Sequence, residues 1–66
     1  MIGQREELDF QLEIVDEKGN IARVLGRLAS LVTAIAAYDE AVKQYPRERI
    51  HLRHRARIVR NSERPG

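Results

Sequence analysis

The sequence predicts a small α+β domain of the ββαβ type, with one helix packed on one face of a three-stranded antiparallel sheet of order 2-1-3. Residues 8–15 and 49–60 alternate apolar and polar side chains at the period of a strand. Residues 31–45 repeat apolar side chains at helical spacing. Residues 21–28 lie between the first strand and the helix and fit a second strand.

The first strand begins at Leu8 and ends near Val15, followed by a turn. Asp16 and Gly19 occupy positions that suit a type I turn followed by a bulge, which favours a hairpin. A three-residue loop pairs Asp16 with Asn20 and fixes the register of the rest. The register predicts these pairs: Val15 with Ile21, Ile14 with Ala22, Glu13 with Arg23, Leu12 with Val24, Phe10 with Gly26, Asp9 with Arg27 and Leu8 with Leu28.

A second interpretation of residues 21–45 stays open. Apolar residues from Ile21 to Tyr45 also recur at helical spacing, so one long helix could follow Asn20 and give a βαβ unit. That helix would contain Gly26 in its interior at a cost of about 1 kcal/mol, and it would leave the charge-matched pairs unexplained. We therefore favour the hairpin.

The helix is predicted between a cap and a stop. Ser30 can accept a hydrogen bond from the first turn, and Pro46 cannot continue the helix. Alanines at positions 34, 36, 37 and 41 would let its backbone lie close to a sheet.

The last strand is predicted from Arg49 to Arg60. Order 2-1-3 would place its arginines next to Asp9 and Glu13 of the first strand. The domain then covers residues 8–60, with flexible ends at residues 1–7 and 61–66.

Length and composition limit what the chain can do. A chain of 66 residues has a thin core, which self-association would support. With no cysteine, disulfides and thiolate metal sites are excluded. The sequence shows neither a signal peptide nor an apolar run long enough to span a bilayer, so a cytoplasmic protein is expected. No cofactor is expected either.

The second half of the chain contains a pattern of short stretches: Ala34 to Val42, then Tyr45-Pro46, Ile50 to Arg53 and Ala56 to Val59. This pattern resembles small uncharacterised bacterial proteins of unknown function. The resemblance implies no activity and no site residues.

A row of basic residues on the last strand could bind polyanions such as nucleic acid: Arg49, His51, Arg53, Arg55 and Arg57. The alternative is a solvated basic surface partly neutralised by Asp9 and Glu13. The three aromatic residues fall on apolar faces, so stacking on single-stranded RNA is not expected.

The open face of the sheet is also predicted to expose four apolar residues as a candidate interface: Val15, Ile21, Leu25 and Val59. No nucleophile lies beside a base, and His51 and His54 point to opposite faces, so neither catalytic residues nor a metal site is predicted. We expect a non-catalytic interaction module that forms homodimers or binds a protein partner, with nucleic-acid binding as the alternative.

Overall fold

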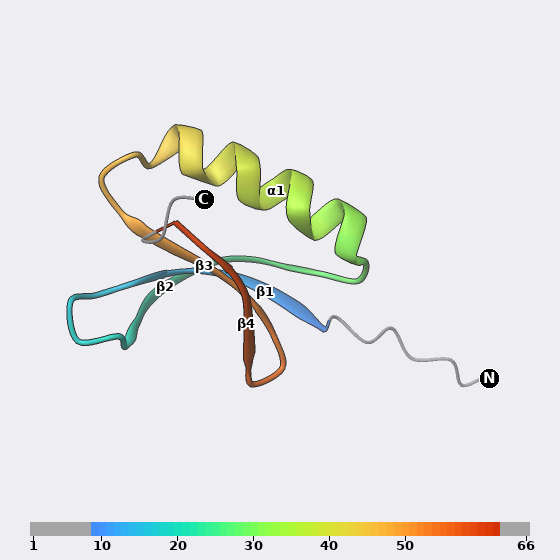
Figure 1. The fold of residues 1–66 in the computed structure, drawn as a ribbon, viewed down its shortest axis with the longest axis horizontal. Coiled ribbons are helices and arrows are strands. Elements are labelled where there is room, and N and C mark those ends of the chain that lie inside the picture. The colour runs from blue at the N-terminus through green and yellow to red at the C-terminus, as the bar shows by residue number, and fades with distance from the viewer. Residues whose placement is uncertain (1–8, 63–66) are drawn as a thin grey trace.

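The computed structural model describes residues 9–62. They form β1 (Phe10–Val15), β2 (Ile21–Leu28), α1 (Leu31–Gln44), β3 (Arg49–His54) and β4 (Arg57–Asn61). The strands make one antiparallel sheet in the order β2-β1-β3-β4. The helix packs on one face of this sheet, mainly over β1 and β3 (Figure 1). The α+β class with one helix on one face is therefore confirmed.

Residues 21–28 form a strand, so the hairpin is confirmed and the long helix over residues 21–45 is wrong. The turn is stabilised by Asp16, whose Oδ1 accepts from the backbone N–H groups of Lys18 and Asn20, at 2.9 Å each. Gly19 follows with a φ of +86°, which glycine adopts without a steric penalty.

The helix begins and ends at the predicted signals. The Ser30 hydroxyl oxygen accepts from the backbone N–H of Thr33 at 3.2 Å and caps the first turn. At the other end the Tyr45 N–H donates to the Ala41 carbonyl at 2.8 Å, and Pro46 follows.

The predicted order 2-1-3 is confirmed for β2, β1 and β3. The sheet has four strands and not three, because the predicted strand over residues 49–60 is a hairpin of β3 and β4. Arg55 and Ala56 form its two-residue loop, and His54 pairs with Arg57. Arg55 has a φ of +60°, the sign that the first loop position of a type II′ turn requires. Arg55 and Ala56 continue the alternation of polar and apolar residues that begins at Arg49. The alternation therefore gives no sign of the turn.

The sheet also includes two residues of the segment predicted to be a C-terminal tail. Asn61 is the last residue of β4, and Ser62 is hydrogen-bonded to β3. The Ser62 N–H donates to the Ile50 carbonyl at 3.0 Å, and the Ile50 N–H donates to the Ser62 hydroxyl at 2.9 Å. The predicted flexible end at residues 1–7 and the last four residues of the predicted tail at 61–66 lie outside the described residues, as does the predicted pair of Leu8 with Leu28.

The β1–β2 register agrees with the prediction only at Val15 and Ile21. Two bulges in β2 insert Ala22 and Leu25 as extra residues. Relative to the predicted register, the bulge at Ala22 shifts the pairing by one residue, and the bulge at Leu25 increases the shift to two residues. The observed partners are Ile14 with Arg23, Glu13 with Val24, Leu12 with Gly26, Gln11 with Arg27 and Phe10 with Leu28. The predicted Glu13–Arg23 charge pair is therefore wrong, and Phe10 does not lie opposite Gly26.

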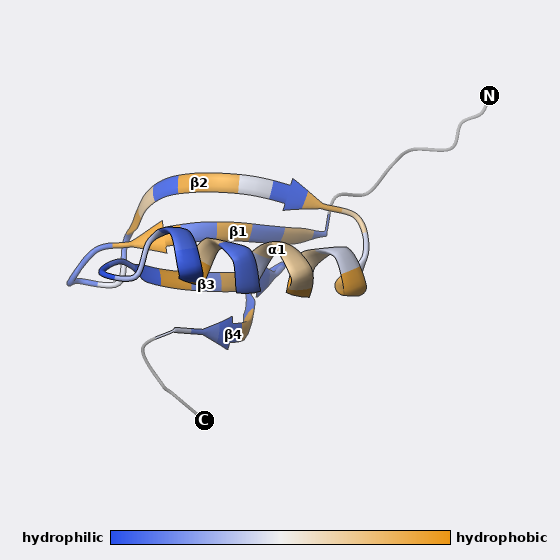
Figure 2. Cartoon of the chain, turned by 90° about the horizontal axis from the view of Figure 1, so that it is seen from above, coloured by the Kyte–Doolittle hydropathy of each residue, from blue (hydrophilic) through white to orange (hydrophobic). Residues whose placement is uncertain are grey.

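The core lies between α1 and the two central strands. Its buried residues are Leu12, Ile14, Ala34, Ala41, Ile50 and Leu52, with the last two fully inaccessible to solvent. Apolar and polar residues alternate along β1 (Figure 2). The alternation in β1 and β3 turns the apolar side of each of these two strands toward the helix. The expected packing of helix alanines against the sheet is confirmed at Ala34 and Ala41.

The left-handed backbone of Arg55 gives a testable prediction. We expect Arg55→Gly to be more stable than Arg55→Ala by about 1 kcal/mol, because only the side chain of alanine is strained at positive φ. Both variants remove the same exposed ion pair to Asp9, so their difference isolates the backbone effect. Urea denaturation measures it, and an alanine variant at least as stable as the glycine variant would contradict the turn.

Candidate interaction surface

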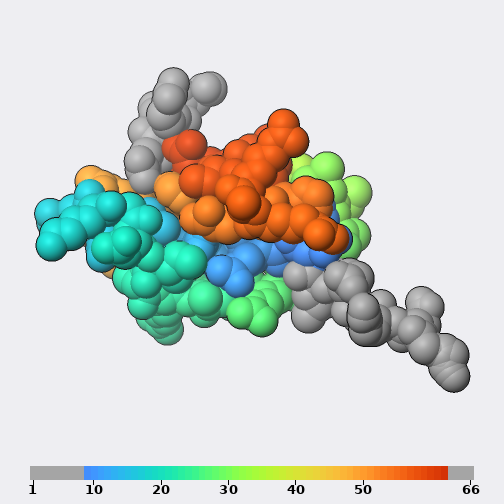
Figure 3. Space-filling model, turned by 90° about the horizontal axis from the view of Figure 1, so that it is seen from below, coloured from blue at the N-terminus to red at the C-terminus, as the bar shows by residue number. Residues whose placement is uncertain are grey.

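The face of the sheet away from α1, which we call the open face, is organised in three rows of paired residues. Directly paired residues of an antiparallel sheet lie on the same face. The rows are Arg27, Gln11, Arg53 and Ile58; Val24, Glu13, His51 and Asn61; and Ile21, Val15 and Arg49. Seen from this side, β1 is visible between β2 and the β3–β4 hairpin (Figure 3).

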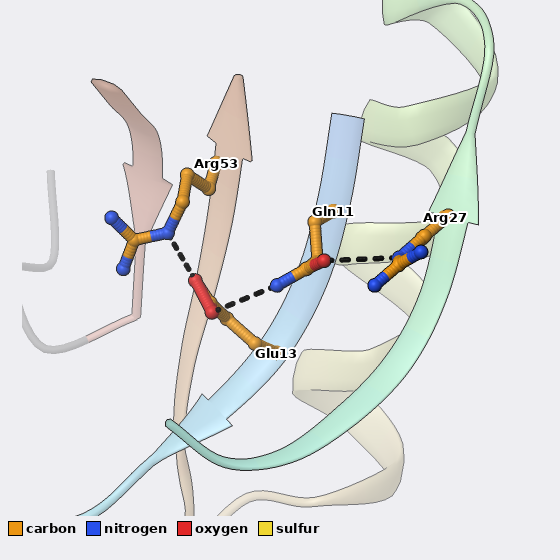
Figure 4. Close-up of polar contacts among 4 residues, drawn as sticks. All are labelled: Gln11, Glu13, Arg27 and Arg53. Atoms are coloured by element: carbon orange, nitrogen blue, oxygen red, sulfur yellow. Dashed lines mark hydrogen bonds and ion pairs between the residues drawn. The ribbon is translucent and has the colours of Figure 1, made fainter. Parts of the chain in front are cut away.

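A chain of polar contacts crosses the open face from β2 to β3 (Figure 4). Arg27 Nε donates to Gln11 Oε1 at 3.1 Å, and Gln11 Nε2 donates to Glu13 Oε1 at 3.3 Å. Arg53 Nε pairs with Glu13 Oε2 at 2.5 Å. Both oxygens of the carboxylate are therefore engaged.

Glu13 is the centre of this polar chain. Its side chain is fully buried, whereas that of Arg53 is 25% exposed. A buried carboxylate is tolerated only when it is paired and hydrogen-bonded, which explains why three strands contribute to the chain. The two terminal nitrogens of Arg53 point away from Glu13 (Figure 4).

Apolar side chains flank the polar chain on both sides. Ile21 is 47% exposed, Val24 44% and Ile58 42%, and the pairing places all three on the open face. Ile21 and Val24 belong to β2, whereas Ile58 belongs to β4. A polar centre thus lies between two apolar flanks.

The predicted exposure of four apolar residues on the open face is confirmed only in part, and the interface itself stays a prediction. Ile21 is exposed on the open face as predicted, but Val15 is buried at 3% exposure. Leu25 is the extra residue of a bulge and packs against the core, so Val24 takes its place on the open face. Val59 is likewise the extra residue of a bulge in β4 and is half-buried, while Ile58 lies on the open face. Sequence reasoning missed Val24 because strict alternation contains no signal for the bulge at Leu25. It missed Ile58 because the alternation contains no signal for the turn at Arg55 and Ala56.

The predicted basic row does not form one continuous surface. Arg49, His51 and Arg53 share the open face, but Arg53 is neutralised by Glu13. Arg49 Nη1 donates to the Asp16 carbonyl at 3.3 Å. Arg55 lies in the loop and pairs with Asp9 at 3.3 Å, whereas Arg57 pairs with His54 and therefore lies on the helix side. The predicted closeness of the basic residues to Asp9 and Glu13 is confirmed.

The two histidines lie on opposite faces, as predicted. His54 stacks on Phe10 with ring centroids 4.5 Å apart, and its Nε2 lies 4.0 Å from Asp9 Oδ2. On the same side of the sheet, burial raises the pKa of the Tyr38 hydroxyl; nearby Asp39 also raises it, and Arg60 lowers it.

A groove of about 250 Å³ between α1 and β2 is lined by residues such as Leu25, Ala37 and Tyr45. Within residues 9–62 no three His, Asp or Glu side chains cluster as metal ligands. Nor does the described helix have the length and apolar character needed to cross a membrane.

The fold and surface define a small α+β protein whose four-stranded antiparallel sheet has one face covered by a helix and the other open. No family model, curated protein or solved structure matches the chain.

Proposed function

We propose that the protein is a non-catalytic interaction module that binds a partner protein through the open face of its sheet. The observation that carries this proposal is the exposure of Ile21, Val24 and Ile58 around the buried Glu13–Arg53 pair. Interfaces commonly combine apolar side chains with arginine, and aligned apolar residues on one sheet face are typical of docking surfaces.

Self-association is a less well supported form of this proposal. The open face carries Arg27, Arg49 and Arg53 against the single carboxylate of Glu13, so two copies would bring like charges together. The outer edge of β2 is also unsuited to pairing with a second β2, because two bulges and the exposed Arg23 and Arg27 interrupt it. We therefore favour a different chain as the partner.

Nucleic-acid binding, the alternative expected from the basic row, has weaker support. Two of its arginines are paired with carboxylates, and Arg57 lies on the opposite side of the sheet. The described residues of the open face include no Phe, Tyr or Trp ring that could stack on a base. Exposed isoleucine and valine side chains suit a peptide better than a phosphate backbone.

Selection from a random peptide library displayed on phage tests the proposal. We expect the protein to enrich peptides whose binding weakens about tenfold or more in Ile58→Ser, because burying such a side chain contributes more than about 1.4 kcal/mol. Val32→Ser is the matched control, since Val32 is 80% exposed but lies on α1. It should leave binding unchanged.

Circular dichroism confirms that both variants fold. Failure to enrich any peptide would contradict the proposal. So would peptides whose binding is weakened by Val32→Ser and not by Ile58→Ser.

A further inference from the structure

We infer that the partner presents a segment with two carboxylates flanked by apolar side chains, and that Arg27 and Arg53 bind these carboxylates. This inference rests on the proposed function of the open face. It identifies the partner by its chemistry: an acidic, partly apolar protein segment.

The two arginines are placed by the sheet itself. Arg27 and Arg53 are both register partners of Gln11, one on each side of β1. Two strand spacings separate them, so their backbones lie roughly 9–10 Å apart. Strand pairing, unlike a mobile loop, fixes this separation.

Each guanidinium is also held in orientation by one contact. Arg27 uses Nε to reach Gln11, and Arg53 uses Nε to reach Glu13. A guanidinium has further donors on its two terminal nitrogens, in a planar fork that matches a carboxylate. Because the described contacts engage Nε, the fork can bind a ligand without breaking the polar chain. Orientation before binding reduces the entropy lost on association.

The charge of the open face selects an anionic partner. Its three arginines and one glutamate leave an excess of two positive charges. The charge of Glu13 is already counted in this excess, and its two carboxylate oxygens are engaged by Arg53 and Gln11. An acidic segment matches this charge, whereas a second copy of the same face does not.

The apolar flanks distinguish a protein carboxylate from a nucleic-acid phosphate. Val24 lies in the row next to that of Arg27, and Ile58 is the direct partner of Arg53. Apolar side chains of a peptide can cover Val24 and Ile58, whereas a nucleic acid would place its charged phosphate groups against them.

The peptides selected on the protein are sequenced in the closing experiment, and the best binder is synthesised in two forms. One form keeps its Asp and Glu residues, and the other replaces them by Asn and Gln. Fluorescence anisotropy then measures binding to wild type, to Arg27→Gln and to Arg23→Gln. The last variant is the matched control, because Arg23 lies on the same strand opposite Ile14 of the core face.

We expect the selected peptides to be enriched in acidic residues, and the amide form to bind at least about tenfold more weakly. In Arg27→Gln the ratio of the affinities for the acidic and the amide peptide should be at least threefold smaller than in wild type. In Arg23→Gln this ratio should equal that of wild type. A selection that yields neutral or basic peptides bound through Ile58 overturns this inference but supports the proposed function. Equal effects of Arg27→Gln and Arg23→Gln, or tight binding of a single-stranded oligonucleotide that competes with the peptide, also overturn it.

Discussion

Leu52→Ala is expected to lower the free energy of unfolding by about 2–5 kcal/mol, the range found when a buried leucine is truncated. Leu52 is fully inaccessible to solvent on a central strand, opposite Leu12 and beneath α1. A domain this small has few other buried side chains to compensate, so the variant should be largely unfolded at room temperature.

Urea denaturation followed by circular dichroism measures this loss. Val32→Ala is the control, because Val32 is 80% exposed and its truncation should change stability by less than about 0.5 kcal/mol. Similar losses in the two variants would show that Leu52 does not lie in the core.

Arg53→Gln is expected to lower the free energy of unfolding by about 3 kcal/mol or more at neutral pH. Removing one partner of a buried ion pair leaves the other charge uncompensated, and this typically costs about 3–5 kcal/mol. Here the remaining charge is Glu13, whose side chain is fully buried. Gln11 would remain as a neutral donor to the carboxylate, with no positive charge beside it.

The double variant Glu13→Gln/Arg53→Gln tests whether the two residues act as a pair. Two amides can hydrogen-bond to each other without a buried charge, so we expect this variant to be more stable than Arg53→Gln alone. The coupling energy from the double-mutant cycle should exceed about 1 kcal/mol. Strictly additive losses would show that Glu13 and Arg53 are not partners.

The sequence alone was sufficient for the elements whose signals are local. Ser30 and Pro46 delimit the helix, and Asp16 with Gly19 defines the first turn, because capping and turn chemistry involve only nearby residues. The alternation of Ile50, Leu52 and His54 with basic residues likewise identifies a strand and the side that faces the core. The predicted strand order also placed the basic residues beside Asp9 and Glu13.

Only the tertiary structure decided where the strands bulge and turn. Nothing local marks the insertion of Leu25, whose place in the core depends on the packing of α1 against the sheet. The sequence does not reveal the loop at Arg55 either, because its residue with positive φ is neither glycine nor asparagine. The backbone N–H of Arg55 donates to the carbonyl of Asp9, which directly precedes β1. These long-range contacts move Val24 and Ile58 to the open face and place Arg27 and Arg53 on either side of Gln11. The surface that we propose as functional therefore depends on strand register, which distant parts of the chain determine together.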